Sequence, residues 1–392
     1  MTAKARTSAI RVLVGLCAAV VTGALMGCDD STQAPPPSFF ADRNPDRLSA
    51  WGQFDVSGGA LVLGERVTVY DLSTPLFTDY ALKLRTIWIP DGLGAGRLQD
   101  DGAPDFPVGT VISKTFYYAR GAADGSDAAR LHVLKQDDVS GVFDPRLADL
   151  ARVRLMETRL LVRRQAGWQP VSYIWNEAQD EAYLARLGDV MAMSMDDGAG
   201  GWRQFAYIVP DINQCASCHA PNNTTRAIEP LGVHQRHLDR PVSYRGAAEN
   251  QLAYLQASGV VAAVAEAAGA MANVDWRDPA QPLVLRARAY LDINCAHCHN
   301  PVGPADTSGL DLTATAEHGL TTGVCKLPIA AGSGTGGRAA SIVPGAPDAS
   351  ILVYRMETTD PAAMMPELGR TLAHDEGVDL IRRWVEAMDG SC

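Results

Sequence analysis

The sequence is short of basic residues, and this limits the partners it can have. Its 392 residues hold 34 Lys and Arg against 45 Asp and Glu, which gives a net charge of −11. Nucleic-acid-binding proteins normally carry a basic surface, so the balance argues against nucleic acid as a partner. Apolar residues make up 47% of the chain, which is enough for a packed core. The composition therefore excludes a disordered chain and a multi-span membrane protein, and the length suggests two or three domains.

The first 27 residues have the character of an export signal. Basic residues precede the apolar run from Val12 to Ala24, which is shorter than the roughly 20 residues that a spanning helix needs. The run ends in Leu25-Met26-Gly27-Cys28, which resembles the lipobox of bacterial lipoproteins. The resemblance implies cleavage before Cys28 and a lipid on Cys28. Ordinary cleavage that leaves Cys28 unmodified is the alternative.

Removal of residues 1–27 makes the mature chain more acidic, because three basic residues and no acidic ones leave with it. The mature net charge becomes −14. Residues 28–50 contain Pro35-Pro36-Pro37 and are expected to form an extended tether. We therefore expect an exported protein on the periplasmic side, anchored by lipid to the inner or the outer membrane, in a compartment where exposed thiols are oxidised.

Four of the eight cysteines form two matching CxxCH motifs, Cys215 to His219 and Cys295 to His299. Positions i and i+3 lie on one face of a helical turn, so each pair of thiols can form thioethers with the two vinyl groups of one haem. The histidine after each pair, His219 or His299, then binds the iron. The motifs therefore predict two covalently bound c-type haems.

Other uses of two CxxC pairs explain the pattern less well. A four-thiolate zinc site leaves the histidine after each pair unexplained. A thioredoxin-like redox motif belongs near a βαβ pattern, which neither copy has. A disulfide within each motif would close a strained loop.

The segment 282–392 has the order of elements found in a class I cytochrome c, which it resembles. A predicted helix over Pro282 to Asn294 precedes the second motif, and a glycine-rich region follows it. A short helix near Ser350 to Met356 and a long amphipathic C-terminal helix complete the order. In that family the iron is bound by a methionine that is followed by proline and precedes the last helix. The resemblance therefore implies that Met365 binds the second iron. Core filling by Met364 and Met365 is the alternative.

Cys325 and Cys392 are the only mature thiols left without a role. In an oxidising compartment an even pair is most simply a disulfide, here between the glycine-rich region and the C-terminus. Two free buried thiols are the alternative.

The sequence does not decide which residue is the second axial ligand of the first haem. In the segment 211–281, Met271 lies at a reasonable distance beyond His219, and His237 is a weaker candidate. Methionines at positions 191, 193 and 195 could reach over from the preceding segment. A first haem with an open position is the remaining alternative.

Residues 51–210 have the alternation and the β-branched and aromatic composition of strands. The expected fold class is therefore a multidomain α+β protein, in which a sandwich-like antiparallel β domain precedes mostly α-helical haem domains. The stretch from Phe106 to Lys114 is similar to the Pro-x-Gly-Thr-x-x-x-Lys stretch of cytochrome P460-type domains. No CxxCH accompanies that stretch, so we expect only an analogy of fold.

Taken together, the mature chain resembles a family of bacterial dihaem c-type cytochromes. The most specific stretches are Ala287 to Pro301, which includes the second motif, and Met364 to Gly369. The resemblance implies electron transfer, and the acidic charge favours redox partner proteins with a basic docking face. The alternative is a dihaem enzyme, of peroxidase or oxidase type, with an open first haem. No catalytic residue is predicted.

Overall fold

The computed structural model describes residues 36–99, 104–120, 131–136, 142–143, 148–244, 247–263, 272–329 and 331–392, together with Thr2. The chain divides into two units, Met1–Thr32 and Gln33–Cys392, and the second unit holds both CxxCH motifs. Cys28 and Met271 lie outside the described residues, so the predictions made for them remain predictions. No helix in the described ranges is both long and apolar enough to cross a membrane.

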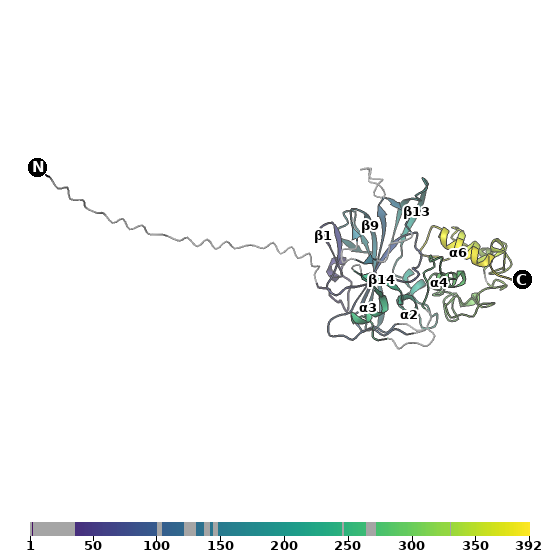
Figure 1. Cartoon of the computed structure of the whole chain (residues 1–392), viewed down its shortest axis with the longest axis horizontal. Coiled ribbons are helices and arrows are strands. Elements are labelled where there is room, and N and C mark those ends of the chain that lie inside the picture. Colours follow the sequence, from purple (N-terminus) through teal and green to yellow (C-terminus); the bar gives the residue numbers. More distant parts are fainter. Residues whose placement is uncertain are drawn as a thin grey trace. The chain divides into compact units, whose positions relative to one another are not determined.

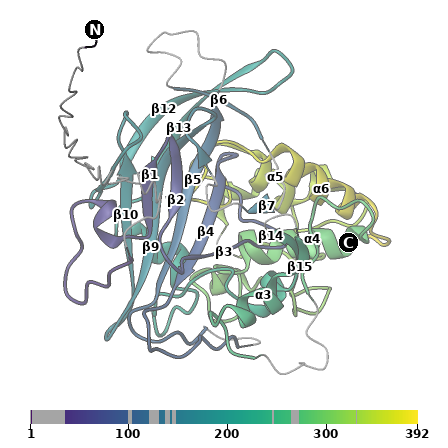
Figure 2. The same cartoon turned by 60° about the vertical axis from the view of Figure 1, so that its left-hand side comes forward.

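A curled sheet of nine strands is the largest element of the second unit (Figures 1 and 2). Its order is β11-β10-β9-β5, and two branches continue from β5: β4 with β3, and β6 with β12 and β13. Neighbouring strands run antiparallel except β6 and β12, which are parallel. The strands are β3 (Thr68–Tyr70), β4 (Leu82–Trp88), β5 (Val111–Arg120), β6 (His132–Leu134), β9 (Val153–Arg164), β10 (Gly167–Trp175), β11 (Ala182–Leu184), β12 (Asp189–Asp196) and β13 (Trp202–Val209).

Both faces of this sheet are covered, because successive residues of a strand point to opposite faces. In β9, Leu160 faces a cluster that contains Trp51, whereas Leu161 faces a cluster that contains Leu238 and Ile293. The second cluster joins strand residues to residues that flank the two CxxCH motifs. The predicted sandwich is therefore wrong: one face of a single curled sheet packs against the chain segments that carry the motifs.

Two small sheets complete the β structure. One consists of β1 (Phe54–Ser57), β2 (Ala60–Leu63) and β8 (Ala148–Asp149), and the other of β7 (Val142–Phe143), β14 (Pro241–Tyr244) and β15 (Ala247–Asn250). β14 follows the first motif and pairs in parallel with β7, which precedes it. This pairing ties the two halves of the chain together.

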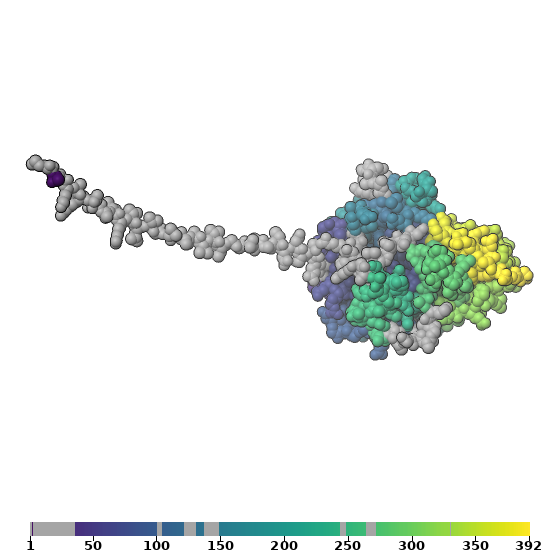
Figure 3. Space-filling view, viewed as in Figure 1, coloured from purple at the N-terminus to yellow at the C-terminus, as the bar shows by residue number. Residues whose placement is uncertain are grey.

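The helices predicted around the second motif are present, and they are short. They are α4 (Leu283–Cys295), α5 (Ile351–Glu357) and α6 (Asp375–Glu386), while α1 (Gln214–His219), α2 (Gln235–Leu238) and α3 (Gln251–Ala257) lie in the segment between β13 and α4. Apolar side chains of α4, α5 and α6 form one core cluster, which includes Tyr290, Val353 and Trp384. Figure 3 shows the surface of the C-terminal residues that include α6, in yellow, away from the purple N-terminal part of the same unit.

The prediction of mostly α-helical haem domains is wrong. The structure is 27% strand and 20% helix. Between α4 and α5 the described chain forms turns and the 3-10 helices η3 (Asp306–Ser308), η4 (Gly332–Thr335) and η5 (Pro347–Ala349). Side-chain periodicity located the three helices around the second motif correctly. It did not show how much of the chain is held by hydrogen bonds between loops, such as the bond from Cys325 N–H to the Ile342 carbonyl at 2.9 Å.

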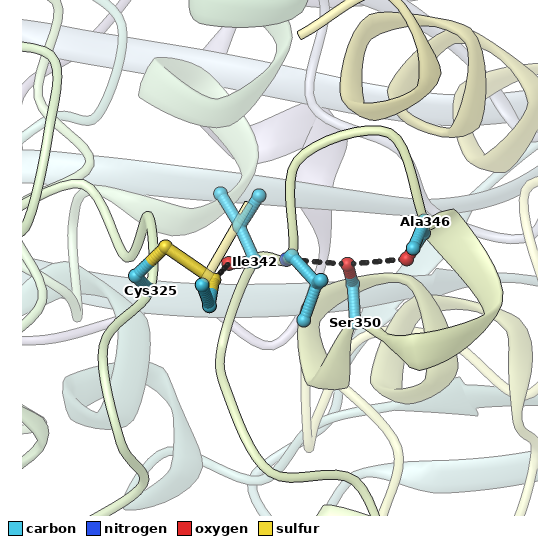
Figure 4. Close-up of a disulfide and its surroundings, with 6 residues drawn as sticks. Cys325, Ile342, Ala346 and Ser350 are labelled. Carbon is cyan, nitrogen blue, oxygen red and sulfur yellow. Dashed lines mark hydrogen bonds between the residues drawn. A yellow bond between two sulfur atoms is a disulfide. The ribbon is translucent and has the colours of Figure 1, made fainter. Parts of the chain in front are cut away.

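A disulfide joins Cys325 to Cys392, the pair expected from the sequence. Figure 4 shows this bond beside Ile342, whose carbonyl also lies 3.8 Å from the Cys392 sulfur. Ser350 fixes the same turn, because its hydroxyl accepts from Val343 N–H and donates to the Ala346 carbonyl. The bond thus connects the C-terminus to the long connection between α4 and α5.

Replacing both Cys325 and Cys392 by serine should lower the free energy of unfolding by about 4 kcal/mol, because a cross-link over 67 positions restricts the unfolded chain. Urea denaturation of the purified protein measures the change. Reductant should destabilise the wild type and leave the double variant unaffected. Equal stability of the two proteins would contradict the prediction.

Candidate functional site

The first motif forms the short helix α1 directly after the last strand of the large sheet. Asp211 starts the helix, because its carboxylate accepts from Asn213 N–H at 2.7 Å and from Gln214 N–H at 3.0 Å. The thiol of Cys215 contacts the Asp211 carbonyl at 3.4 Å and is buried, while Cys218 is half-buried one turn later. Both thiols are unpaired.

The second motif begins at the last residue of α4. Cys295 ends the helix, and Cys298 and His299 follow in turns held by backbone bonds to the Cys295 carbonyl. Both thiols are again unpaired, so the structure forms no disulfide within either motif.

The two motif histidines are held in the same way, because each makes a hydrogen bond through Nδ1. Nδ1 of His219 lies 2.8 Å from the Glu229 carbonyl, which can only accept, so Nδ1 carries the proton. Nδ1 of His299 lies 3.1 Å from the Ser308 hydroxyl, whose own proton goes to the Ala305 carbonyl. In both rings the free lone pair is therefore on Nε2, as iron coordination requires.

Burial keeps the donor groups of both motifs neutral. It lowers the pKa of His219 to about 3 and that of His299 to about 4. It raises the pKa of Cys295 and of Cys298 to about 12. The nearby amine of Lys114 lowers the His219 value further. Because neutral imidazole is the form that binds iron, this environment suits an axial ligand.

The two motifs touch one another. The Cys298 thiol lies 3.6 Å from the Ser217 carbonyl. Just beyond the second motif, the Asn300 amide donates to the Pro221 carbonyl at 3.2 Å, and Asn223 N–H donates to the Val302 carbonyl at 2.7 Å. Residues about 80 positions apart thus form a single site.

A cavity of about 580 Å³ lies beside the second motif. This falls within the range of ligand-binding cavities, roughly 300–1,000 Å³. Cys295, Cys298 and His299 line it together with Met365, whereas Met364 is buried elsewhere and is not among its lining residues. The structure thus brings the predicted Met365 to the same cavity as His299.

Met365 is positioned by a buried arginine. Arg370 donates to the carbonyls of Met365, Leu372, Arg355 and Thr358 at 3.0–3.1 Å, which fixes the loop on both sides of the methionine. Asp79, from the segment before β4, accepts from the N–H groups of residues 371 and 372. These anchors were not predicted, because their partners are backbone groups that carry no sequence signal.

A second cavity, of about 120 Å³, lies beside the first motif against the large sheet. Cys215, Cys218 and His219 line it, and the sheet contributes cationic side chains. These are Arg85, Lys114 and Arg159. Burial lowers the pKa of Lys114 to about 7, while Arg159 is paired with the buried carboxylate of Glu157 at 2.6 Å.

Lys114 ends the stretch that resembles P460-type domains, and the structure places it at the first CxxCH. Cys215, Cys218 and His219 line the same cavity and follow Lys114 in the sequence by about 100 residues. The first CxxCH therefore lies beside this stretch in space although it does not accompany it in the sequence, because β13 returns the chain to the face that carries Lys114.

His237, the weaker candidate ligand, does not line either cavity and has both ring nitrogens occupied. Its Nε2 lies 3.1 Å from the Asp292 carboxylate, and its Nδ1 lies 3.2 Å from the Asn273 amide. Met193 and Met195 are packed in an apolar cluster with Tyr207. None of these side chains faces His219 across the cavity.

The donor groups at each motif suit a haem; the cavity of about 580 Å³ beside the second motif has the volume of a ligand site, whereas the cavity of about 120 Å³ beside the first is smaller than that range. Each site combines two unpaired thiols one turn apart with a histidine whose Nε2 lone pair is free, and the cavity at the second motif also has a methionine. In the described part of the chain, no group of three or more His, Cys, Asp or Glu residues is arranged to hold a metal ion by itself. Comparisons with family models, curated proteins and solved structures find no match for this chain.

Asp292 is a structural residue of the site that the sequence did not single out. It is buried just before the second motif and accepts from Arg236 at 2.9 Å, Asn273 at 2.8 Å and Ala314 N–H at 3.0 Å. Together with its bond to His237, these contacts connect α4 to α2 and to the loop that follows the motif.

Replacing Asp292 by alanine should cost about 3–5 kcal/mol of stability, because the buried His237 and the half-buried Arg236 would both lose their partner. Asp379 is a matched control, since its pair with Arg383 is exposed and its removal should change stability little. Chemical denaturation measures both. Equal effects of the two substitutions would contradict this account of Asp292.

The same residue gives the stability a defined pH dependence. Burial alone raises its pKa, but the hydrogen bond from His237 and the charge of Arg236 together hold the pKa of Asp292 well below its usual range. Ionised Asp292 stabilises the fold at any pH above about 4, the pKa of an aspartate in the unfolded chain. This stabilisation is lost progressively as the pH falls below that value. Asp292→Asn should therefore show a shallower loss of stability between about pH 5 and pH 3 than the wild type.

Proposed function

We propose that this protein is an exported dihaem c-type cytochrome that transfers single electrons between redox partners. The observation that supports this most is the direct contact between the two CxxCH segments, at Cys298 and Ser217. Their cavities share the lining residues Phe77, Cys218, His297, Pro366, Leu368 and Arg370. Two redox groups attached here lie close together, which is the arrangement that electron transfer needs.

Each motif supplies the covalent and axial attachment for one haem. Cys215 and Cys218 form the thioethers of the first haem, and His219 binds its iron. Cys295, Cys298, His299 and Met365 do the same for the second. The haems supply two one-electron redox centres, and the protein sets their potentials through ligands and burial.

The chain around the second motif favours a high potential there. Met365 and His299 line the same cavity and would offer a haem iron a thioether and an imidazole, and a methionine–histidine pair raises the reduction potential relative to two nitrogen ligands. The cavity is lined by apolar side chains such as Leu312 and Ile351, which disfavour the additional charge of the oxidised iron. The second haem is therefore the more easily reduced of the two.

The acidic mature chain, with a net charge of −14, suits a basic redox partner. Complementary charge speeds encounter and is weakened by salt. A lipid on Cys28 holds the protein at a membrane surface, where a donor or an acceptor is also located.

The two motifs should each account for one haem. In the matured protein, Cys215→Ser with Cys218→Ser should halve the covalent haem content, and so should Cys295→Ser with Cys298→Ser. A pyridine haemochrome assay against protein concentration measures the content. Changing Cys325 and Cys392 to serine is the control, which should retain both haems. A wild-type protein without haem would contradict the proposal.

Met365→Leu should remove the thioether ligand, shift the spectrum of one haem and lower the potential of that haem. Met364→Leu is a matched control in the neighbouring residue, and it should leave spectrum and potentials unchanged. A spectroscopic redox titration of the purified proteins measures both. An equal effect of the two substitutions would contradict the assignment of Met365.

The alternative function, a dihaem enzyme with an open first haem, makes a different spectral prediction. An open position gives one high-spin haem that binds CO when reduced, whereas the carrier has two low-spin haems. The same titration therefore distinguishes the two functions.

A further inference from the structure

His297 occupies an unusual place in the site, because it belongs to the second motif and also reaches the cavity of the first. It lies between Cys295 and Cys298 in the sequence. It lines the cavity that contains His299 and also the cavity that contains His219. The residue at the same position of the first motif, Ser217, lines only the cavity of the second motif.

One ring nitrogen of His297 is enclosed by protein, and the other is not among the enclosed atoms. Nδ1 is the enclosed nitrogen, and the ring is hydrogen-bonded to the Ile293 backbone. Since an enclosed atom cannot reach a group in the cavity, Nε2 is the nitrogen through which His297 can contact a cofactor. The side chains of His219 and His297 are near enough to influence each other electrostatically.

The cavity beside the first motif offers few other iron ligands. Among the residues that the structure places in its lining, there is no methionine, and His297 is the one histidine besides His219. His237 is committed to Asp292 and Asn273, as described above. Lys114 is the other nitrogen donor of the lining.

We propose that His297 is the second axial ligand of the haem attached at Cys215 and Cys218, opposite His219. This assignment rests on the proposed function, since it presupposes a haem at the first motif. Each haem then depends on the second motif: His299 binds one iron and His297, two residues earlier, binds the other. One short peptide segment connects the two iron centres.

The assignment has two consequences for electron transfer. The first haem has two nitrogen ligands and therefore a lower potential than the second, which has histidine and methionine. A single electron accepted from an external donor protein at the first haem passes downhill to the second and leaves to an external acceptor, with no other reactant consumed. The first haem also has no open position for a substrate.

The test compares His297→Ala with His318→Ala, which removes an exposed histidine that lines neither cavity, in the matured full-length protein. The wild type and His318→Ala should show two low-spin haems in electron paramagnetic resonance and no CO binding after reduction. His297→Ala should retain two haems, of which one becomes high-spin and binds CO. Added imidazole should restore the low-spin state.

Two low-spin haems in His297→Ala would overturn the assignment and favour Lys114 as the ligand. CO binding by the reduced wild type would also overturn the assignment, because it shows an open position at one iron. If the variant fails to fold, near-infrared magnetic circular dichroism of the wild type still decides. One bis-histidine haem and one histidine–methionine haem support the assignment, and any other pair of ligand sets overturns it. A wild-type protein without any haem overturns the proposed function as well.

Discussion

Cys298 lies against the backbone of Ser217, and this contact between two distant segments determines the shape of the whole site. It places the second motif at the edge of the cavity beside the first, so that the two cavities share a wall. Asn300 and Asn223 extend the contact through hydrogen bonds to the opposite backbone. Because both motifs meet here, neither haem segment is an independent module.

The large sheet supplies what the first haem segment lacks. α1 has six residues, and the segment that follows it contains only short helices and one hairpin. Such a segment has too little apolar material to surround a large flat cofactor by itself. It packs instead on one face of β5 and β9, where Ile112 and Leu161 join Leu238 and Ile293 in a common cluster. This is the physical reason that the expected fold class, with mostly α-helical haem domains, is wrong.

The residues with the strongest sequence signals were those whose chemistry requires a fixed spacing. The CxxCH motifs and Met365 before Pro366 could be recognised locally, and the structure brings Met365 to the cavity of the second motif. The pair Cys325 and Cys392 followed from elimination of the other thiols, and the structure joins them. The anchors Asp79, Asp292 and Arg370 could not, because their partners are backbone groups or side chains far away in sequence. His297 was visible inside a motif, but only its position in both cavities gives it a role.

The sequence by itself indicates the kind of chemistry that we propose, since the motif for covalent haem attachment consists of three residues within five positions. It also located the helices around the second motif and several strands of the large sheet, because periodicity is a local property. Only the tertiary structure decided which segments meet: that Lys114 on β5 faces Cys218, and that His297 reaches the cavity of the other motif. Such contacts depend on burial of apolar faces across the whole chain, and the pattern of any single segment does not contain that information.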